Sequence, residues 1–113
     1  MRKYTLRFRK ADKDIFKAIL NGKKKVETRA ATIRYRDMKA GDVVVFLCGE
    51  DTFEKKVKHI QIFKTITAML HKYSVKDIMP SLSSKKELEN SYYRYPGYRE
   101  KIRKYGLVAL ELK

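Results

Sequence analysis

The chain has 113 residues, enough for one domain, and a domain of this size buries roughly 65% of the surface that its unfolded form exposes. Its apolar fraction of 43% and aromatic fraction of 12% exclude a disordered chain. The formal net charge is +15, and 13 Lys and Arg against 3 acids give residues 1–36 a charge of +10. Such a field favours RNA, DNA, nucleotides and other polyanions, although a well-solvated lysine-rich surface would also account for it.

The longest apolar run, residues 43–48, is far shorter than the roughly 20 residues that a membrane-spanning helix needs. The N-terminus lacks the apolar segment of a signal peptide. Cys48 is the only cysteine, and its place at the end of an apolar strand predicts a buried structural thiol. We therefore expect a cytoplasmic protein with no membrane partner.

The N-terminal half predicts strands and one short helix. Residues 3–9 alternate as a strand with one buried face, and Asp12 is placed to cap an amphipathic helix that ends at Asn21-Gly22. Residues 24–30 predict a second strand, with Val26 and Thr28 on one face and Lys25, Glu27 and Arg29 on the other, charged face. A loop over residues 32–39 and the turn Gly41-Asp42 lead to an apolar strand, residues 43–48.

The C-terminal half predicts a basic strand, short helices and a final strand. The strand covers residues 54–64, and the pattern becomes helical from Thr67. Ser74 is placed to cap a helix that Pro80 stops, and Ser83 or Ser84 to cap another, with Glu87 in position for a capping box. A helical turn over residues 98–104 precedes a last strand, residues 107–112. These elements predict an α+β domain, a small β-barrel with short helices packed around it, whose N- and C-terminal strands pair.

The segment from Gly22 to Arg29 places one carboxylate, Glu27, among four cations. Isolated ionised groups are costly to bury, so this cluster is either solvated or lines a cleft that binds an anion. Lys24 can act as a general base if neighbouring cations or desolvation lower its pKa, an effect that Glu27 opposes. Three roles stay open here: catalysis by Lys24 and Glu27, binding of an anionic ligand, and a structural ion pair.

Glu27 also has a binding role that needs no chemistry, because a carboxylate accepts hydrogen bonds from an exocyclic base amine such as that of cytosine. Arg34 and Arg36 flank Tyr35 in an arrangement suited to stacking an unpaired base. The alternative is that Tyr35 packs on the barrel and both arginines are solvated. A second basic and aromatic cluster lies near the C-terminus, and it includes Tyr95.

The catalytic candidates are therefore Lys24 and Glu27. The candidates for binding RNA or a nucleotide are Lys24, Lys25, Glu27, Arg29, Arg34, Tyr35, Arg36 and Tyr95. His59 and His71 have no partner at metal-ligand spacing, and no Walker, dinucleotide or Ser-His-Asp motif is present. We expect no metal and no cofactor.

Four features together resemble the ASCH (activating signal cointegrator homology) domain family, over nearly the whole chain. They are the amphipathic helix, the segment Gly-Lys-Lys-Lys-Val-Glu-Thr-Arg with the Arg-containing loop, Gly-Asp before an apolar strand, and the ending Tyr-Gly-Leu-Val-Ala-Leu-Glu-Leu. The segment from Tyr95 to Gly106 also looks like small prokaryotic single-domain members. The resemblance implies a β-barrel related to the PUA fold, with a basic cleft.

The same resemblance implies RNA or nucleotide binding, and for some members hydrolysis. One branch of the family removes the acyl group of N4-acetylcytidine, and ribonuclease activity has been attributed to others. In the amidohydrolase branch the catalytic pair is a lysine after the glycine and a threonine three residues later. Lys24 matches that lysine, whereas Glu27 stands at the threonine position, so the family's nucleophile is absent. The leading hypothesis is a binding module, and a small hydrolase that uses the same cleft is the alternative.

Overall fold

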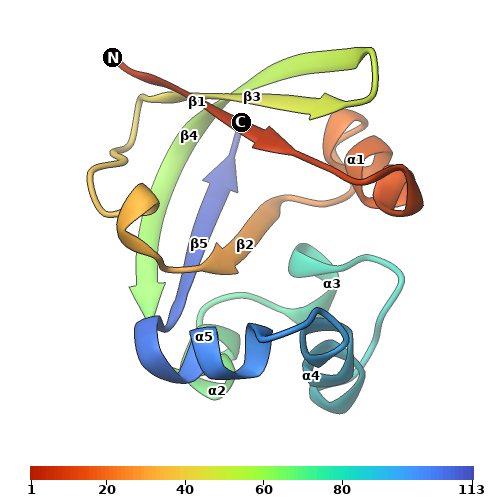
Figure 1. The fold of residues 1–113 in the computed structure, drawn as a ribbon, viewed down its shortest axis with the longest axis vertical. Coiled ribbons are helices and arrows are strands. Elements are labelled where there is room, and N and C mark those ends of the chain that lie inside the picture. Colours follow the sequence, from red (N-terminus) through yellow and green to blue (C-terminus); the bar gives the residue numbers. More distant parts are fainter.

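The sheet of this protein has five strands in the order β1-β3-β4-β5-β2, as seen in a computed structural model that describes residues 1–113 (Figure 1). The strands are β1 (Lys3–Arg7), β2 (Val26–Ala30), β3 (Val43–Cys48), β4 (Asp51–Phe63) and β5 (Leu107–Leu112). The helices are α1 (Lys13–Leu20), α2 (Ile66–Leu70), α3 (Val75–Ile78), α4 (Lys85–Tyr93) and α5 (Tyr98–Tyr105), with short 3-10 turns at Lys10–Asp12 and Ile33–Tyr35. The domain is a small α+β fold with a sheet curled into a half-barrel, as the sequence predicts in class.

The long strand β4 curls the sheet. Its first half pairs antiparallel with β3, from Cys48 against Asp51 to Val43 against Lys56. Its second half pairs antiparallel with β5, and the register shifts between Val57 and His59. Such an irregularity bends a strand and increases its twist, so the two halves of β4 belong to differently oriented parts of one sheet.

The expected pairing of the N- and C-terminal strands is wrong. β1 pairs parallel with β3, and β5 lies between β4 and β2, so both edges of β5 are already used. The half-barrel is therefore open between its two edge strands, β1 and β2. Figure 1 shows β1 crossing on one side of this opening, β2 on the other, and helices α3 to α5 below it.

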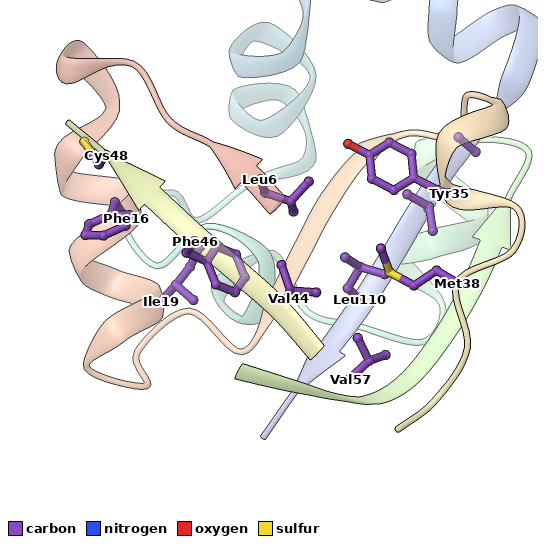
Figure 2. Close-up of a cluster of buried hydrophobic side chains, with 12 residues drawn as sticks. Leu6, Phe16, Ile19, Tyr35, Met38, Val44, Phe46, Cys48, Val57 and Leu110 are labelled. Carbon is purple, nitrogen blue, oxygen red and sulfur yellow. The ribbon is translucent and has the colours of Figure 1, made fainter. Parts of the chain in front are cut away.

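Two hydrophobic clusters hold the fold together. The inner cluster fills the curl of the sheet and includes Leu6, Phe46 and Leu110, with Phe16 and Ile19 from α1 (Figure 2). The outer cluster lies between the sheet and helices α2 to α5, and it takes its residues from both. β5 is buried on both faces, because alternate residues enter the two clusters: Val108 and Leu110 face inward, and Leu107 and Ala109 face the helices. Cys48 belongs to the inner cluster, which confirms a buried free thiol.

The helix ends match the sequence in two of three cases. Ser74 forms a capping box with Asp77, and the Ser84 hydroxyl accepts from the backbone N–H of Glu87. The expected capping box at Glu87 does not close on Ser84, because the Glu87 carboxylate accepts from the backbone N–H of Ser83. Asp12 precedes α1 but makes no capping hydrogen bond, because its carboxylate accepts from Nε of Arg9 at 3.0 Å instead. None of the helices is both long and apolar enough to cross a bilayer. The fold brings together no group of three or more His, Cys, Asp or Glu side chains that could hold a metal ion.

Candidate functional site

A pocket of about 270 Å³ lies where the half-barrel is open. Its wall is formed by the end of β1 and the residues after it, by β2 with the turn before it, and by residues of α4, α5 and the loop that joins them. Four cations and two carboxylates line it, which gives the pocket a net positive charge: Arg7, Arg9, Lys24 and Arg29 against Asp12 and Glu27. The volume lies just below the roughly 300–1,000 Å³ typical of ligand sites, so the pocket suits a small molecule or a single base.

Glu27 lies at the centre of a buried charge cluster. Its Oε1 is 3.4 Å from Nζ of Lys24, and its Oε2 accepts from Nε of Arg29 at 3.2 Å. The backbone N–H of Thr28 also donates to Oε1, at 3.1 Å. Lys24 is 2% exposed and Glu27 is 4% exposed. The cluster has two basic side chains for one carboxylate, and the side chain of Arg29, which is 27% exposed, is the part of it that reaches solvent.

The contact between Lys24 and Glu27 depends on where β2 begins. On a regular strand, two residues three positions apart face opposite ways. The strand starts only at Val26, so Lys24 precedes it and its side chain turns toward α3, where Nζ donates to the backbone carbonyl of Ile78. This turn before the strand is what lets two side chains three positions apart meet.

The surroundings of Lys24 disfavour its charged form. Burial lowers the pKa of Lys24, the carboxylate of Glu27 opposes that shift, and the nearby Arg29 adds to it. A lysine of this kind gives up its proton more readily than one in solvent, which is the property that a general base needs.

Tyrosines from the helices close the side of the pocket that faces α4 and α5. The hydroxyls of Thr28 and Tyr92 share a hydrogen bond, and the hydroxyl of Tyr98 accepts from the backbone N–H of Ala30 at 2.7 Å. Burial raises the pKa of both tyrosines, so both hydroxyls stay protonated at neutral pH. The Tyr98 bond satisfies one backbone N–H on the free edge of β2, and the hydroxyl hydrogen of Tyr98 remains able to donate to a ligand.

Two cations lie against aromatic rings at the pocket. The guanidinium of Arg29 is 4.9 Å from the ring centre of Phe8, and that of Arg9 is 5.0 Å from the ring centre of Tyr95. The Nε of Arg9 also pairs with Asp12 at 3.0 Å. The guanidinium of Arg29 is held between Phe8 and Glu27, whereas the side chain of Arg9 is 65% exposed and lies at the solvent side of the pocket.

Four of the predicted site residues meet in this pocket, and four do not. Those that meet are Lys24, Glu27, Arg29 and Tyr95. Lys25, Arg34 and Arg36 are exposed and lie outside it, and Arg34 donates to the backbone carbonyl of Thr5 in β1.

Tyr35 is 6% exposed and belongs to the inner hydrophobic cluster, among whose side chains Figure 2 shows it. Its ring is therefore not accessible for stacking a base, although the guanidinium carbon of Arg34 does lie 5.8 Å from its centre. The reason is that this short 3-10 turn covers the inner cluster, where an aromatic ring contributes most by burial.

Three residues that line the pocket, Phe8, Arg9 and Thr28, are not among the sites predicted from the sequence. Phe8 and Arg9 follow β1 and reach the pocket only because the sheet curls, and Thr28 lines it although it was assigned to the face opposite Glu27. The basic and aromatic composition of residues 7–9 was the available signal for them. The basic and aromatic cluster predicted near the C-terminus contributes Tyr92, Tyr95 and Tyr98 to this pocket.

No family model matches the chain, and no curated protein matches it. Two solved structures are similar over almost its whole length. The crystal structure of hypothetical protein PH0355 has a TM-score of 0.84 at 29% identity and covers 98% of this chain and 97% of that one. The solution structure of protein PF0455 from Pyrococcus furiosus has a TM-score of 0.76 at 29% identity, covering 98% and 96%. These similarities support the α+β half-barrel fold.

Proposed function

We propose that this protein is a small ASCH-like, PUA-like domain that binds RNA or a nucleotide in the pocket between β1 and β2. The observation that carries the proposal is the buried cluster of Lys24, Glu27 and Arg29, which opens onto a pocket lined by more cations than carboxylates. This excess of basic side chains over carboxylates around the pocket favours an anionic ligand, because the ligand supplies counter-charge.

Glu27 gives the proposed site a way to select a base. A carboxylate offers about four lone-pair positions, and three donors from the protein already use this one: Thr28 and Lys24 at Oε1, and Arg29 at Oε2. One position on Oε2 remains for the exocyclic amine of a base such as cytosine. A base with a carbonyl in that place, such as uracil, would set two acceptors against each other.

The cations at the mouth of the pocket suit the phosphate. Arg7 and Arg9 line the pocket but stand apart from the buried cluster, so they meet the part of a nucleotide that lies farthest from Glu27. The ring of Tyr95 beside Arg9 offers a surface for stacking the base or sugar. The expected ligand is therefore a nucleotide, free or within single-stranded RNA, with an amine-bearing base.

Calorimetric titration with cytidine and uridine monophosphates tests this proposal. We expect cytidine monophosphate to bind at least about tenfold more tightly, because one good base contact contributes about 1–3 kcal/mol of discrimination. Glu27→Gln should remove the preference, and Arg9→Ala should weaken both ligands equally. Lys25→Ala is the matched control, since Lys25 is an exposed cation beside Lys24 and outside the pocket. Equal affinity for the two nucleotides, or a loss in the control as large as in Arg9→Ala, would sink the proposal.

A hydrolase acting in the same pocket is the second candidate, favoured by the lowered pKa of Lys24 beside Glu27. In this reading neutral Lys24 accepts a proton from water during hydrolysis of an acylated amino group on a base. Incubation with N4-acetylcytidine, and separately with labelled RNA, tests it. The hydrolase candidate predicts product that forms faster as pH rises toward the pKa of Lys24 and that Lys24→Met abolishes. No product with the wild-type protein leaves binding as the function.

A further inference from the structure

A second hollow of about 370 Å³ lies on α4 and α5, away from the pocket described above. Three cations line it, Lys64 after β4 and both Arg99 and Arg103 of α5, against the single carboxylate of Glu89. It shares no lining residue with the first pocket. The same two helices therefore carry a positive hollow on each of two sides.

The pairs of neighbouring residues on these helices divide between the two hollows. On α4, Tyr92 lines the first pocket and Tyr93 lines the second hollow. At the start of α5, Tyr98 lines the first and Arg99 the second. Consecutive residues on a helix point about 100° apart, so this division follows directly from the helical geometry.

Tyr93 is the aromatic surface of the second hollow. It is 37% exposed, whereas the neighbouring Tyr92 is 6% exposed. The guanidinium carbon of Arg99 is 5.1 Å from the centre of the Tyr93 ring. An accessible aromatic ring beside a guanidinium group is the arrangement on which proteins stack an unpaired base while contacting its phosphate.

The cations of this hollow are largely free to meet a ligand. Neither Lys64 nor Arg99 forms an ion pair within the protein, and the pair of Arg103 with Glu100 is exposed on both sides. An exposed pair of this kind contributes little to stability, so a phosphate can replace the carboxylate at small cost.

We propose that this second hollow is a contact site for single-stranded RNA, in which a base stacks on Tyr93 and phosphates meet Arg99, Arg103 and Lys64. This inference rests on the proposed function, since it assigns the path of the strand outside the first pocket. The exposed ring favours nucleic acid over an acidic peptide, because an acidic peptide would need the cations alone. A helix with its side chains is about 10–12 Å wide, so a strand of several nucleotides that crosses α4 and α5 contacts both sites, whereas a mononucleotide fills only the first.

Fluorescence anisotropy with a labelled eight-nucleotide cytidine RNA, from 50 to 200 mM salt, tests the inference beside the calorimetric titration with cytidine monophosphate. We expect Tyr93→Ala and Arg99→Ala each to weaken the RNA about tenfold and to leave the mononucleotide affinity unchanged. Tyr93→Phe should retain the RNA affinity, since it keeps the ring. Arg99→Ala should also lower the slope of log affinity against log salt by about one. Arg94→Ala is the matched control, because Arg94 ends α4, is exposed and lines neither hollow.

The two proposals fail in different ways. If RNA affinity is the same in the wild type, Tyr93→Ala and Arg99→Ala, the second site is wrong, whatever the mononucleotide does. A loss in Arg94→Ala equal to that in Arg99→Ala also overturns it, since the effect is then only net charge. Binding of an acidic peptide that Tyr93→Ala leaves intact, without RNA binding, would assign the hollow to a protein partner and overturn the inference. Absence of mononucleotide binding together with Tyr93-dependent RNA binding would contradict only the first pocket.

Discussion

The Nζ of Lys24 lies 3.4 Å from Oε1 of Glu27, and both side chains are almost completely buried. This contact joins the turn before β2 to the strand itself, and Arg29 pairs with the other oxygen of the same carboxylate. Glu27 therefore supplies the one carboxylate that pairs with both the buried Lys24 and the partly exposed Arg29. The stability of this part of the fold and the chemistry of the pocket depend on the same carboxylate.

Replacement of Glu27 should therefore cost more stability than replacement of Lys24. Glu27→Gln leaves the buried Lys24 and the partly exposed Arg29 without their carboxylate, and removal of one partner from a buried pair typically costs about 3–5 kcal/mol. Lys24→Met keeps the pair of Glu27 with Arg29 and fills most of the same space, so its cost should be smaller. Urea unfolding of both variants measures the difference. A Lys24→Met protein that is less stable than Glu27→Gln would contradict the central place of the carboxylate.

The hydrogen bond between Thr28 and Tyr92 should couple β2 to α4. Thr28→Val and Tyr92→Phe should each destabilise the protein by about 1–3 kcal/mol, because each variant leaves the other residue's buried hydroxyl without a hydrogen-bond partner. The double variant should cost clearly less than the sum, since it leaves no orphaned group. Thermal and urea unfolding of the four proteins in this cycle give the coupling. Strict additivity would show that the two hydroxyls do not interact in solution.

Asp42 should make the stability depend on pH in the acid range. Its carboxylate accepts from the backbone N–H groups of Arg2 at 3.0 Å and Lys39 at 2.8 Å, and these bonds lower its pKa. A lowered folded-state pKa means that the stabilisation is complete above the usual carboxyl range and is lost as pH falls through the lower, folded value. Asp42→Asn should thus have a lower free energy of unfolding than the wild type near pH 7. This difference in unfolding free energy should become smaller in acid. A difference in unfolding free energy that stays constant from pH 7 to pH 2 would show that the ionised carboxylate of Asp42 does not stabilise the fold.

Gly106 should be the least replaceable glycine. Its φ is +80°, and a Cβ at this position would overlap the backbone carbonyl of Phe63, at the junction of α5 with β5. We expect Gly106→Ala to cost at least about 3 kcal/mol, from backbone strain and overpacking together. Gly22→Ala is the control, because Gly22 has a φ of +82° but nothing within 4 Å of such a Cβ, and it should cost about 1–2 kcal/mol. Equal costs, measured by unfolding, would show that the close approach to Phe63 has no effect.

Much of the fold could be predicted because its elements carry local signals. The apolar run of β3, the three-four spacing of α1 and the capping serines of α3 and α4 are each contained within a few residues. The pairing of β1 could not be predicted in the same way. It depends on which strand edges are left free, since β5 is already paired on both sides by β4 and β2, and that is a property of the whole sheet.

The candidate site could also be predicted only in part, because only some of its residues are neighbours in the sequence. Lys24, Glu27 and Arg29 lie within six residues of one another, so their concentration of charge is visible in the sequence. Arg34 and Arg36 flank Tyr35 in the sequence, and this pattern predicts a base-stacking site. The position of Tyr35 in the fold is instead determined by burial of its ring in the inner cluster. Phe8 contributes to the site through the curl of the sheet, which brings the end of β1 to β2 across a separation of about twenty residues in the chain.

A titration of the ¹⁵N-labelled protein with cytidine monophosphate, followed by the amide resonances, tests the central claim most directly. The claim is that a nucleotide enters the opening between β1 and β2 and meets Glu27. We predict saturable shifts of the amides of Arg9, Thr28 and Arg29, with Lys25→Ala behaving as the wild type and Glu27→Gln losing the preference over uridine monophosphate. Resonances of these pocket residues that stay unmoved at millimolar nucleotide, or shifts confined to the outer face of β4, would contradict it.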